Sequence, residues 1–396
     1  MQQRALSSRF HSYVTSITPC GHRRYHASLY KRRPCGQMQR RQWVCFPREQ
    51  SPARRMSTLA AIFMPPAVFC ALVVSLWAYK CLMMVAFQNK IIYMPSVPPF
   101  SRSEQISDYA ASCSPITWRS ESIRSLDGTR LSLAIGENVT MQQQHQSSIS
   151  NPSRGHSLTI VYFQGNASSF PPRMPGLSSV LKQLDASDSP IACTVVALSY
   201  RGFWTSSGRA SQAGIERDAA ATMNWVHEMR NGHSPETKLV LWGQSIGAGV
   251  ATTAAANWLS LSGGKAQGEG LQSNNTYQIN GLLLETPFTS VENMLISLYP
   301  QRWLPYRYLG PFLWNHWNSL KALRTIRARQ EEKMPVLIAT AGKDEVVPSD
   351  QGEDLVSLCK DLGFDMRHCV VSDALHTEVL AKSQGRKAIV DFLRAI

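Results

Sequence analysis

The stretch from residue 239 to residue 256 restricts the fold of this chain more than any other. It reads LVLWGQSIGAGVATTAAA, an apolar run followed by Gly-x-Ser-x-Gly and then by small residues. A strand that turns sharply into a helix at such a serine is typical of a nucleophile elbow. Gly243 and Gly247 have no Cβ, so the backbone can pack closely around Ser245 and leave its hydroxyl exposed. The free N–H at the start of the helix, that of Ile246, would then lie where an oxyanion forms.

Short apolar segments alternate with helical patterns around this stretch. Strands are predicted at 158–163, 193–199, 239–242, 282–285, 336–341 and 367–371. Helices are predicted at 176–184, 210–229, 246–261, 350–362 and 378–393. This alternation predicts βαβ units and therefore an α/β fold with a mostly parallel, doubly wound sheet.

Three further strands are predicted ahead of this alternation. They lie at 116–120, 123–125 and 131–135, with Asp127-Gly128 as the turn of a hairpin. The polar segments 136–157 and 260–278 have no apolar periodicity, so we expect both to be surface insertions.

A serine nucleophile needs a positioned base, and the base needs a carboxylate that fixes its tautomer. In α/β-hydrolases these partners follow the serine in the order acid, then histidine. Asp344 lies just past the strand predicted at 336–341, and His376 lies just past the last predicted strand. The order and spacing predict a triad of Ser245, Asp344 and His376.

Each triad position has a rival. Glu345 is adjacent to Asp344 and Asp373 precedes His376, but Asp344 is nearer to the strand end. His368 starts the last predicted strand, away from the loops that would carry catalysis, so a structural or solvent-exposed role is expected for it.

The second oxyanion donor is expected in the loop after the strand at 158–163, which reads Gln164-Gly165-Asn166-Ala167. The N–H of Asn166 is the candidate partner of the N–H of Ile246; the alternative is an ordinary βα turn. Asn166 also heads one of three N-x-S/T sequons, with Asn138 and Asn274. A glycan on Asn166 would fill the mouth of the site.

The nine cysteines have no metal-like spacing, and their odd number gives no disulfide framework. No zinc site is therefore expected, and a serine nucleophile with a histidine base would need no metal and no organic cofactor.

Residues 1–55 contain 12 Lys or Arg and one acidic residue, Glu49, so they carry +11 of the net charge of +14. Nucleic-acid binding is not favoured, because no recognisable nucleic-acid module accompanies this charge. The segment resembles a mitochondrial transit peptide. The alternatives are a disordered basic tail or upstream sequence with Met56 as the true start.

A run of 21 uncharged residues extends from Leu59 to Tyr79, and a second apolar run reaches Phe87. This length is enough to cross a bilayer of roughly 30 Å. It is too long for the apolar part of a signal peptide, so we expect a single-pass anchor over 56–88. The basic residues before it predict that the N-terminus stays in the cytosol or the mitochondrial matrix.

Prolines mark a juxtamembrane linker over 89–115, and the catalytic domain is expected at 116–396. Within it the segment 298–329 is a candidate cap, rich in aromatic residues: Tyr299, Trp303, Tyr306, Tyr308, Phe312, Trp314 and Trp317. Such a segment suits an acyl chain or a lipid surface, although it is also compatible with a helical excursion that merely covers the sheet.

Six motifs together resemble the membrane-anchored α/β-hydrolase-domain serine hydrolases of eukaryotes. They are YFQGNAS, SYRGFWTSSGRASQAGIERD, GQSIGAGVA, LETPFTS, AGKDEVVP and DALHTEV. That family includes the fungal bud-emergence type and members that remove palmitoyl groups from proteins or cleave lysophospholipids and monoacylglycerols. The family usually has a histidine where this chain has Gln164, whose side chain we expect to hold the loop by hydrogen bonds instead.

The resemblance implies a serine hydrolase, anchored in the endoplasmic reticulum or a mitochondrial membrane, that cleaves an acyl ester or thioester of a lipid or an S-acylated protein. The motifs do not separate these substrates. A catalytically silent membrane scaffold and a serine peptidase are the alternatives.

Overall fold

The computed structural model describes residues 58–147, 157–186, 189–231, 237–262, 278–330 and 332–396. The predicted basic segment 1–55 and the sequon at Asn274 therefore lie outside the described residues. The chain divides into two compact units, 1–63 and 64–396. The fold and the site belong to the second unit.

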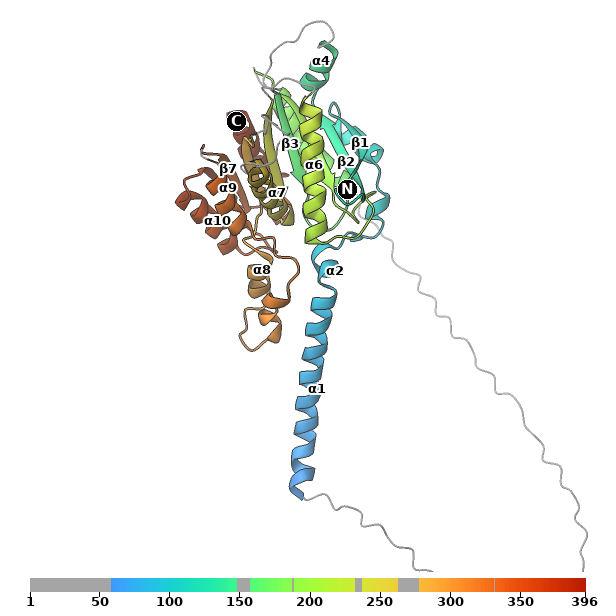
Figure 1. Ribbon diagram of the computed structural model, residues 1–396, viewed down its shortest axis with the longest axis vertical. Coiled ribbons are helices and arrows are strands. Elements are labelled where there is room, and N and C mark those ends of the chain that lie inside the picture. Colours follow the sequence, from blue (N-terminus) through green and yellow to red (C-terminus); the bar gives the residue numbers. More distant parts are fainter. Residues whose placement is uncertain (1–57, 148–156, 187–188, 232–236, 263–277, 331) are drawn as a thin grey trace, which may run out of the picture. The chain divides into compact units, whose positions relative to one another are not determined.

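An eight-stranded sheet forms the centre of the second unit, in the order β1-β2-β4-β3-β5-β6-β7-β8 (Figure 1). The strands are β1 (Thr117–Arg124), β2 (Arg130–Glu137), β3 (Ser157–Phe163), β4 (Ala192–Ser199), β5 (Lys238–Gln244), β6 (Gly281–Glu285), β7 (Pro335–Ala341) and β8 (Asp365–Val371). β2 runs antiparallel to both of its neighbours, and every other pair is parallel. The prediction of a mostly parallel sheet is confirmed, but the two strands expected at 116–120 and 123–125 are the single strand β1.

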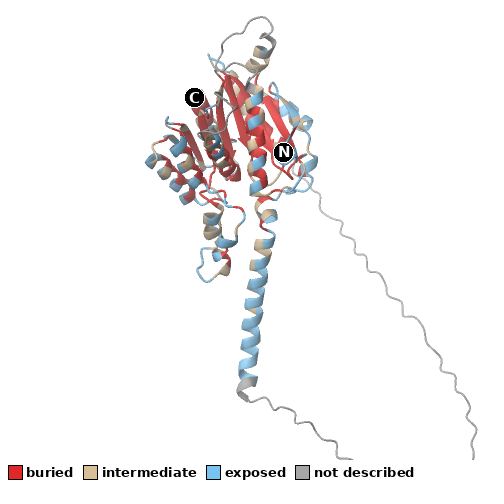
Figure 2. Ribbon diagram, in the orientation of Figure 1, coloured by how far each residue is buried: buried red, intermediate tan, exposed pale blue. Residues whose placement is uncertain are grey.

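The central strands are mostly apolar, as expected for strands covered on both faces of the sheet. Every residue of β3, β4 and β6 is buried, whereas the edge strands β1 and β8 have mostly exposed or half-buried residues (Figure 2).

Helices cover the two faces in separate layers. One hydrophobic cluster joins the sheet to α6 (Gln212–Asn231), α7 (Ile246–Ser262), α9 (Ser319–Arg329) and α10 (Ser349–Asp361). The other joins it to α3 (Ala110–Cys113), α5 (Met174–Asp185) and α11 (Ser383–Ala395). This is the doubly wound arrangement, and it brings the carboxyl ends of the parallel strands to one edge of the sheet.

Two local predictions are corrected. The last helix begins at Ser383 instead of residue 378, because the chain first makes turns after β8. The insertion predicted over 136–157 includes the end of β2 and the helix α4 (Val139–Ser147). Asn138 starts this helix, since its Oδ1 accepts from the N–H of Met141 at 3.0 Å. Asn138 is fully buried, so its sequon cannot carry a glycan in the folded chain.

The region expected as a linker over 89–115 is packed structure. It includes α2 (Gln88–Tyr93), η1 (Ser101–Ser103), η2 (Ile106–Tyr109) and α3. Tyr93 and Cys113 are buried there, at 1% and 0% exposure. The segment therefore belongs to the fold.

The helix α1 (Thr58–Ala86) precedes α2, and Ala61–Ala86 is long and apolar enough to cross a membrane. Its residues are largely exposed (Figure 2). The core helix of a soluble protein would be mostly buried, so this exposure argues against α1 being such a helix.

The cap was expected over 298–329, but its helices begin at Val291 and end at Phe312. It comprises α8 (Val291–Leu298), η4 (Pro305–Tyr308) and η5 (Gly310–Phe312). α9, which was expected within the cap, packs against α7 in the helix layer.

Candidate active site

Ser245 lies at the turn between β5 and α7, with a φ of 53°. Its N–H donates to the carbonyl of Glu285 on the neighbouring strand at 2.8 Å, which fixes the turn. A Cβ on Gly243 would lie 2.2 Å from the carbonyl oxygen of Gly247, and a Cβ on Gly247 would lie 2.0 Å from that of Phe163. Both glycines of the motif are therefore required by backbone contacts.

The structure brings Ser245, His376 and Asp344 together. Nε2 of His376 is 2.8 Å from Oγ of Ser245, and Nδ1 is 2.9 Å from both carboxylate oxygens of Asp344. Because the carboxylate can only accept, the ring proton belongs on Nδ1, and Nε2 is left to accept the serine hydroxyl. These distances suit transfer of the serine proton to the imidazole.

Asp344 is held as a carboxylate by several donors. Burial raises the pKa of Asp344, but hydrogen bonds from His376 and from the N–H groups of Val346 and Val347 lower it below its usual value overall. The two N–H groups lie 2.9 and 2.8 Å from Oδ1. The acid therefore stays charged beside the imidazole.

The alternative candidates for the acid and the base, Glu345, Asp373 and His368, make other contacts. Oε2 of Glu345 accepts from the backbone N–H of His376 at 3.0 Å, so Glu345 supports the histidine loop. Asp373 pairs with Lys343 at the surface. His368 lies within β8, where its Nε2 is 3.1 Å from Oγ1 of Thr340.

The expected oxyanion donors, Asn166 and Ile246, both lie in the wall of the cavity that contains Ser245. Among the described residues neither backbone N–H has an acceptor, whereas the N–H of Ala167 donates to Oδ1 of Asn166 at 2.7 Å and to the carbonyl of Tyr93 at 3.3 Å. The two free N–H groups are therefore available to a ligand atom.

Gln164 departs from the expectation that its side chain holds the loop. Its amide group is fully buried, and no described residue hydrogen-bonds to either Nε2 or Oε1. The loop is held through its backbone instead, since Tyr200 donates to the carbonyl of Gln164 at 2.8 Å.

A cavity of about 460 Å³ opens above Ser245, and its lining is largely apolar. The end of α1 and the α2 region contribute Met84, Val85, Gln88, Ile91, Ile92 and Met94. The cap contributes Val291, Met294, Leu295, Leu298, Tyr299, Leu309 and Leu313. Among the described residues that line it, Arg173 alone has a permanently charged side chain. This volume falls within the range for a small-molecule site, about 300–1,000 Å³.

The aromatic residues of the cap divide into different roles. Tyr299 lines the cavity, and Tyr306 and Trp317 are buried. Trp303 lies 5.8 Å from Trp77 of α1, centroid to centroid, and it is 67% exposed.

Several residues of the site have no signal in the sequence. Those of α1 and α2 lie more than 150 positions before Ser245. Glu285 is buried beside Ser245, where burial raises its pKa and where Nε2 of Gln244 donates to it at 3.0 Å. Within the described residues no group of three or more His, Cys, Asp or Glu could hold a metal.

A solved structure shares this architecture. The α/β-hydrolase from Vibrio vulnificus superposes with a TM-score of 0.55 over 77% of this chain and 92% of its own, at 16% identity. This chain has the α/β-hydrolase fold. At 16% sequence identity, this likeness shows the fold alone.

No family model matches the sequence. This chain is 29% identical to protein bem46 of Schizosaccharomyces pombe, over 58% of this chain and 65% of bem46. It is 29% identical to WAV2, an alpha/beta hydrolase domain-containing protein of Arabidopsis thaliana, over 67% of this chain and 73% of WAV2. It is 32% identical to the lysophosphatidylserine lipase ABHD12 of Danio rerio, over 52% of each protein. The relatives are α/β-hydrolase-domain proteins, as the motifs indicated; the matches to bem46 and ABHD12 span less than two thirds of those proteins.

Proposed function

We propose that this protein is a membrane-anchored serine hydrolase that cleaves a carboxylic ester or thioester of an acyl chain. The observation that carries the proposal is the chain of hydrogen bonds from Asp344 through His376 to Ser245, which ends at an apolar cavity. A serine hydroxyl hydrogen-bonded to a base that a carboxylate orients is an activated nucleophile.

In the proposed reaction Oγ of Ser245 attacks the acyl carbonyl while Nε2 of His376 takes the serine proton. The N–H groups of Ile246 and Asn166 stabilise the negative charge that develops on the carbonyl oxygen. Collapse of this intermediate expels an alcohol or thiol, which receives the proton from His376. Water, deprotonated by the same imidazole, then hydrolyses the acyl-enzyme and releases the fatty acid.

The apolar lining supports an acyl chain as the group that occupies the cavity. An acyl chain would gain roughly 25 cal/mol per Å² of apolar surface that it buries there. A short polar peptide would gain little, so the lining does not favour a peptidase. α1, which has the length and composition of a membrane span, would keep the enzyme at a lipid surface.

Labelling with a fluorophosphonate probe tests the proposal. The wild-type protein in membranes should label, and Ser245→Ala should not. A folded wild-type protein that does not label, or a Ser245→Ala variant that labels equally, would refute it and favour a silent scaffold. Lipid and acyl-protein profiles of cells with either protein should then separate lipid substrates from S-acylated proteins.

A further inference from the structure

The segment that follows α1 is joined to the loop of the expected oxyanion hole. The carbonyl of Tyr93 accepts from the N–H of Ala167 at 3.3 Å, and the carbonyl of Val97 accepts from the N–H of Ser168 at 2.5 Å. The loop that follows Asn166 therefore rests on the backbone of residues 93–97.

That loop adopts a conformation that needs support. Ala167 and Ser168 have φ values of 57° and 63°, consecutive left-handed residues without a glycine. Such residues persist only where the surrounding structure imposes the conformation. On the other side Arg173 donates to the carbonyl of Ser169 at 2.6 Å and to that of Asn166 at 3.4 Å. The side chain of Gln164 makes no hydrogen bond to a described residue, so these contacts, together with the hydrogen bond from Tyr200 to the carbonyl of Gln164, hold the loop.

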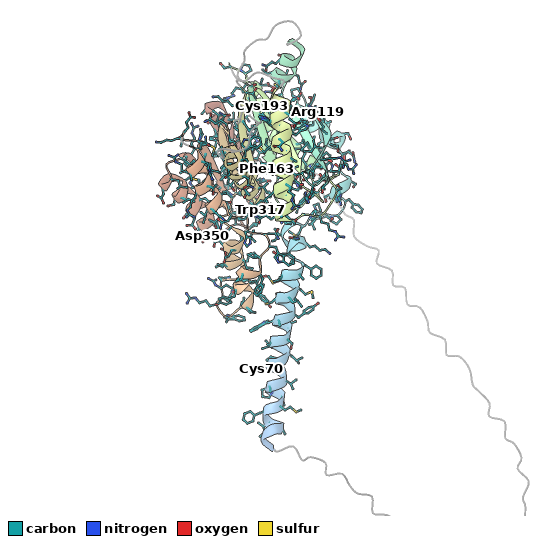
Figure 3. The ribbon with its side chains drawn as sticks, viewed as in Figure 1. Cys70, Arg119, Phe163, Cys193, Trp317 and Asp350 are labelled. Atoms are coloured by element: carbon teal, nitrogen blue, oxygen red, sulfur yellow. The ribbon has the colours of Figure 1, made fainter. Side chains whose placement is uncertain are left out.

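Tyr93 is in turn fixed by the segment between the cap and α9. Its hydroxyl donates to Oδ1 of Asn315 at 2.8 Å and accepts from Nε1 of Trp317 at 2.8 Å. All three side chains are 0–1% exposed. Trp317 lies at the end of the domain nearest to α1 (Figure 3), and its Cβ would lie 3.0 Å from a Cβ on Gly249 of the nucleophile helix.

Two polar residues of the α2 region complete this connection. Nδ2 of Asn315 donates to Oδ1 of Asn89 at 2.7 Å. Oε1 of Gln88 accepts from the N–H of Trp314 at 2.7 Å, and its Nε2 donates to the carbonyl of Phe312 at 3.1 Å. Buried networks in which each group has a partner specify one arrangement of the elements that they join.

We propose that Tyr93 is a positioning residue of this hydrolase: it couples the end of the membrane helix and the cap to the oxyanion loop, and so holds the N–H of Asn166 in place. This inference rests on the proposed function, because it assigns a role within the same reaction. It makes the juxtamembrane segment a part of the active site as well as a tether.

The test is Tyr93→Phe in the full chain, in membranes. Phenylalanine keeps the ring and the backbone carbonyl but removes the hydroxyl that binds Asn315 and Trp317. The complete loss of one oxyanion donor costs about 10²–10³ in kcat. A displaced donor costs less, so we expect kcat per titrated site on a short-chain p-nitrophenyl ester to fall about tenfold, with KM within about twofold. The rate of fluorophosphonate labelling should fall in parallel, since the phosphoryl oxygen occupies the same hole.

Two further variants make the test specific. Tyr308→Phe is the matched control, because Tyr308 donates to the carbonyl of Arg302 at 2.8 Å, is 59% exposed and does not line the cavity. It should match the wild type. Asn89→Ala removes one contact of the connection at a half-buried position, and it should lower kcat about twofold to threefold without loss of folded protein.

Counting active sites by complete fluorophosphonate titration separates positioning from folding. The proposal is wrong if Tyr93→Phe lowers only the melting temperature or the yield while kcat per titrated site stays at the wild-type value. It is also wrong if the pH profile of kcat/KM shifts, since that would place the damage in the triad. If the wild type itself does not label, the proposed function fails instead.

Discussion

The backbone of Ser245 is strained at a φ of 53°, a conformation that costs a non-glycine residue about 1–2 kcal/mol. The turn persists because Glu285 accepts its N–H and because two glycines let α7 approach β3 and β5. A serine on such a turn is aimed away from its own strand and helix. The elbow thus places the hydroxyl of Ser245 in the wall of a cavity that is also lined by two residues whose N–H groups have no acceptor among the described residues.

Replacing Asp344 by asparagine should remove most of the activity. An amide cannot stabilise the imidazolium, and it favours the wrong tautomer of His376. We expect kcat to fall about 10⁴-fold, with KM little changed. Steady-state kinetics on a p-nitrophenyl ester measure this, with the parallel variant Glu345→Gln as the control, since Glu345 binds only the backbone N–H of His376. Equal losses in the two variants would contradict the assignment of the acid.

The same carboxylate should make stability depend on acid pH. The pKa of Asp344 in the folded protein lies below its unfolded value of about 3.9, so its charged form stabilises the fold above that pH. This stabilisation is lost as the pH falls through the folded pKa. The difference in melting temperature between wild type and Asp344→Asn should therefore shrink below about pH 4. A difference that stays constant with pH would show that this carboxylate contributes nothing through its ionisation.

Among the elements of the fold, β4, α6 and the β1–β2 turn are joined by Arg201. It lies just past β4, and its guanidinium binds Asp218 of α6 at 2.7 Å and Asp127 of the β1–β2 turn at 2.8 Å. Its side chain is 9% exposed and that of Asp218 is 0% exposed, so the pair is screened little by water. The motif SYRGFW that contains Arg201 therefore links the end of β4 to α6 and to the β1–β2 hairpin.

Arg201→Met should destabilise the protein by about 3–5 kcal/mol, because it leaves the buried carboxylate of Asp218 without its partner. Arg217→Met is the matched control: Arg217 lies 3.4 Å from the same Asp127, but its side chain is 54% exposed. That change should stay within about 0.5 kcal/mol. Chemical denaturation of the detergent-solubilised full chain measures both, and similar losses in the two variants would contradict the interpretation.

At the scale of the whole molecule, α1 combines two tasks. From Ala61 to Tyr79 its side chains are mostly exposed and apolar, as a membrane span would require, while its last turns line the cavity with Met84 and Val85. In the same region Nζ of Lys80 lies 4.6 Å from the ring centroid of Tyr306 in the cap. The element that would hold the enzyme in the bilayer thus also shapes its binding site.

Leu72→Arg should therefore weaken membrane integration. An arginine near the centre of a span costs roughly 2.5–3.5 kcal/mol of insertion free energy. Leu126→Arg is the control, since Leu126 is 61% exposed on the hydrolase domain and Leu72 is 65% exposed on α1. After alkaline carbonate extraction, the Leu72 variant should move partly to the supernatant and the Leu126 variant should not. Full retention of the Leu72 variant would argue against a membrane span.

The sequence by itself determined the sheet, the elbow and the spacing of Asp344 and His376, because each depends on short-range constraints. Continuous apolar runs specify buried parallel strands, glycines permit the turn at Ser245, and loops after parallel strands meet at one edge. The same local signals missed the capping role of Asn138, and they extended the last helix too far toward residue 378, since turns and caps decide boundaries.

Only the tertiary structure decided how the loop after β3 is held and which residues form the walls of the cavity. Tyr93 and Asn315 are 222 positions apart, and no local pattern predicts that they meet. Whether Gln164 finds a partner, or whether residues 89–115 pack as part of the domain, depends on which distant groups surround them. Local sequence fixes the conformation of an element, but the partners of a buried polar side chain are fixed by how the elements pack.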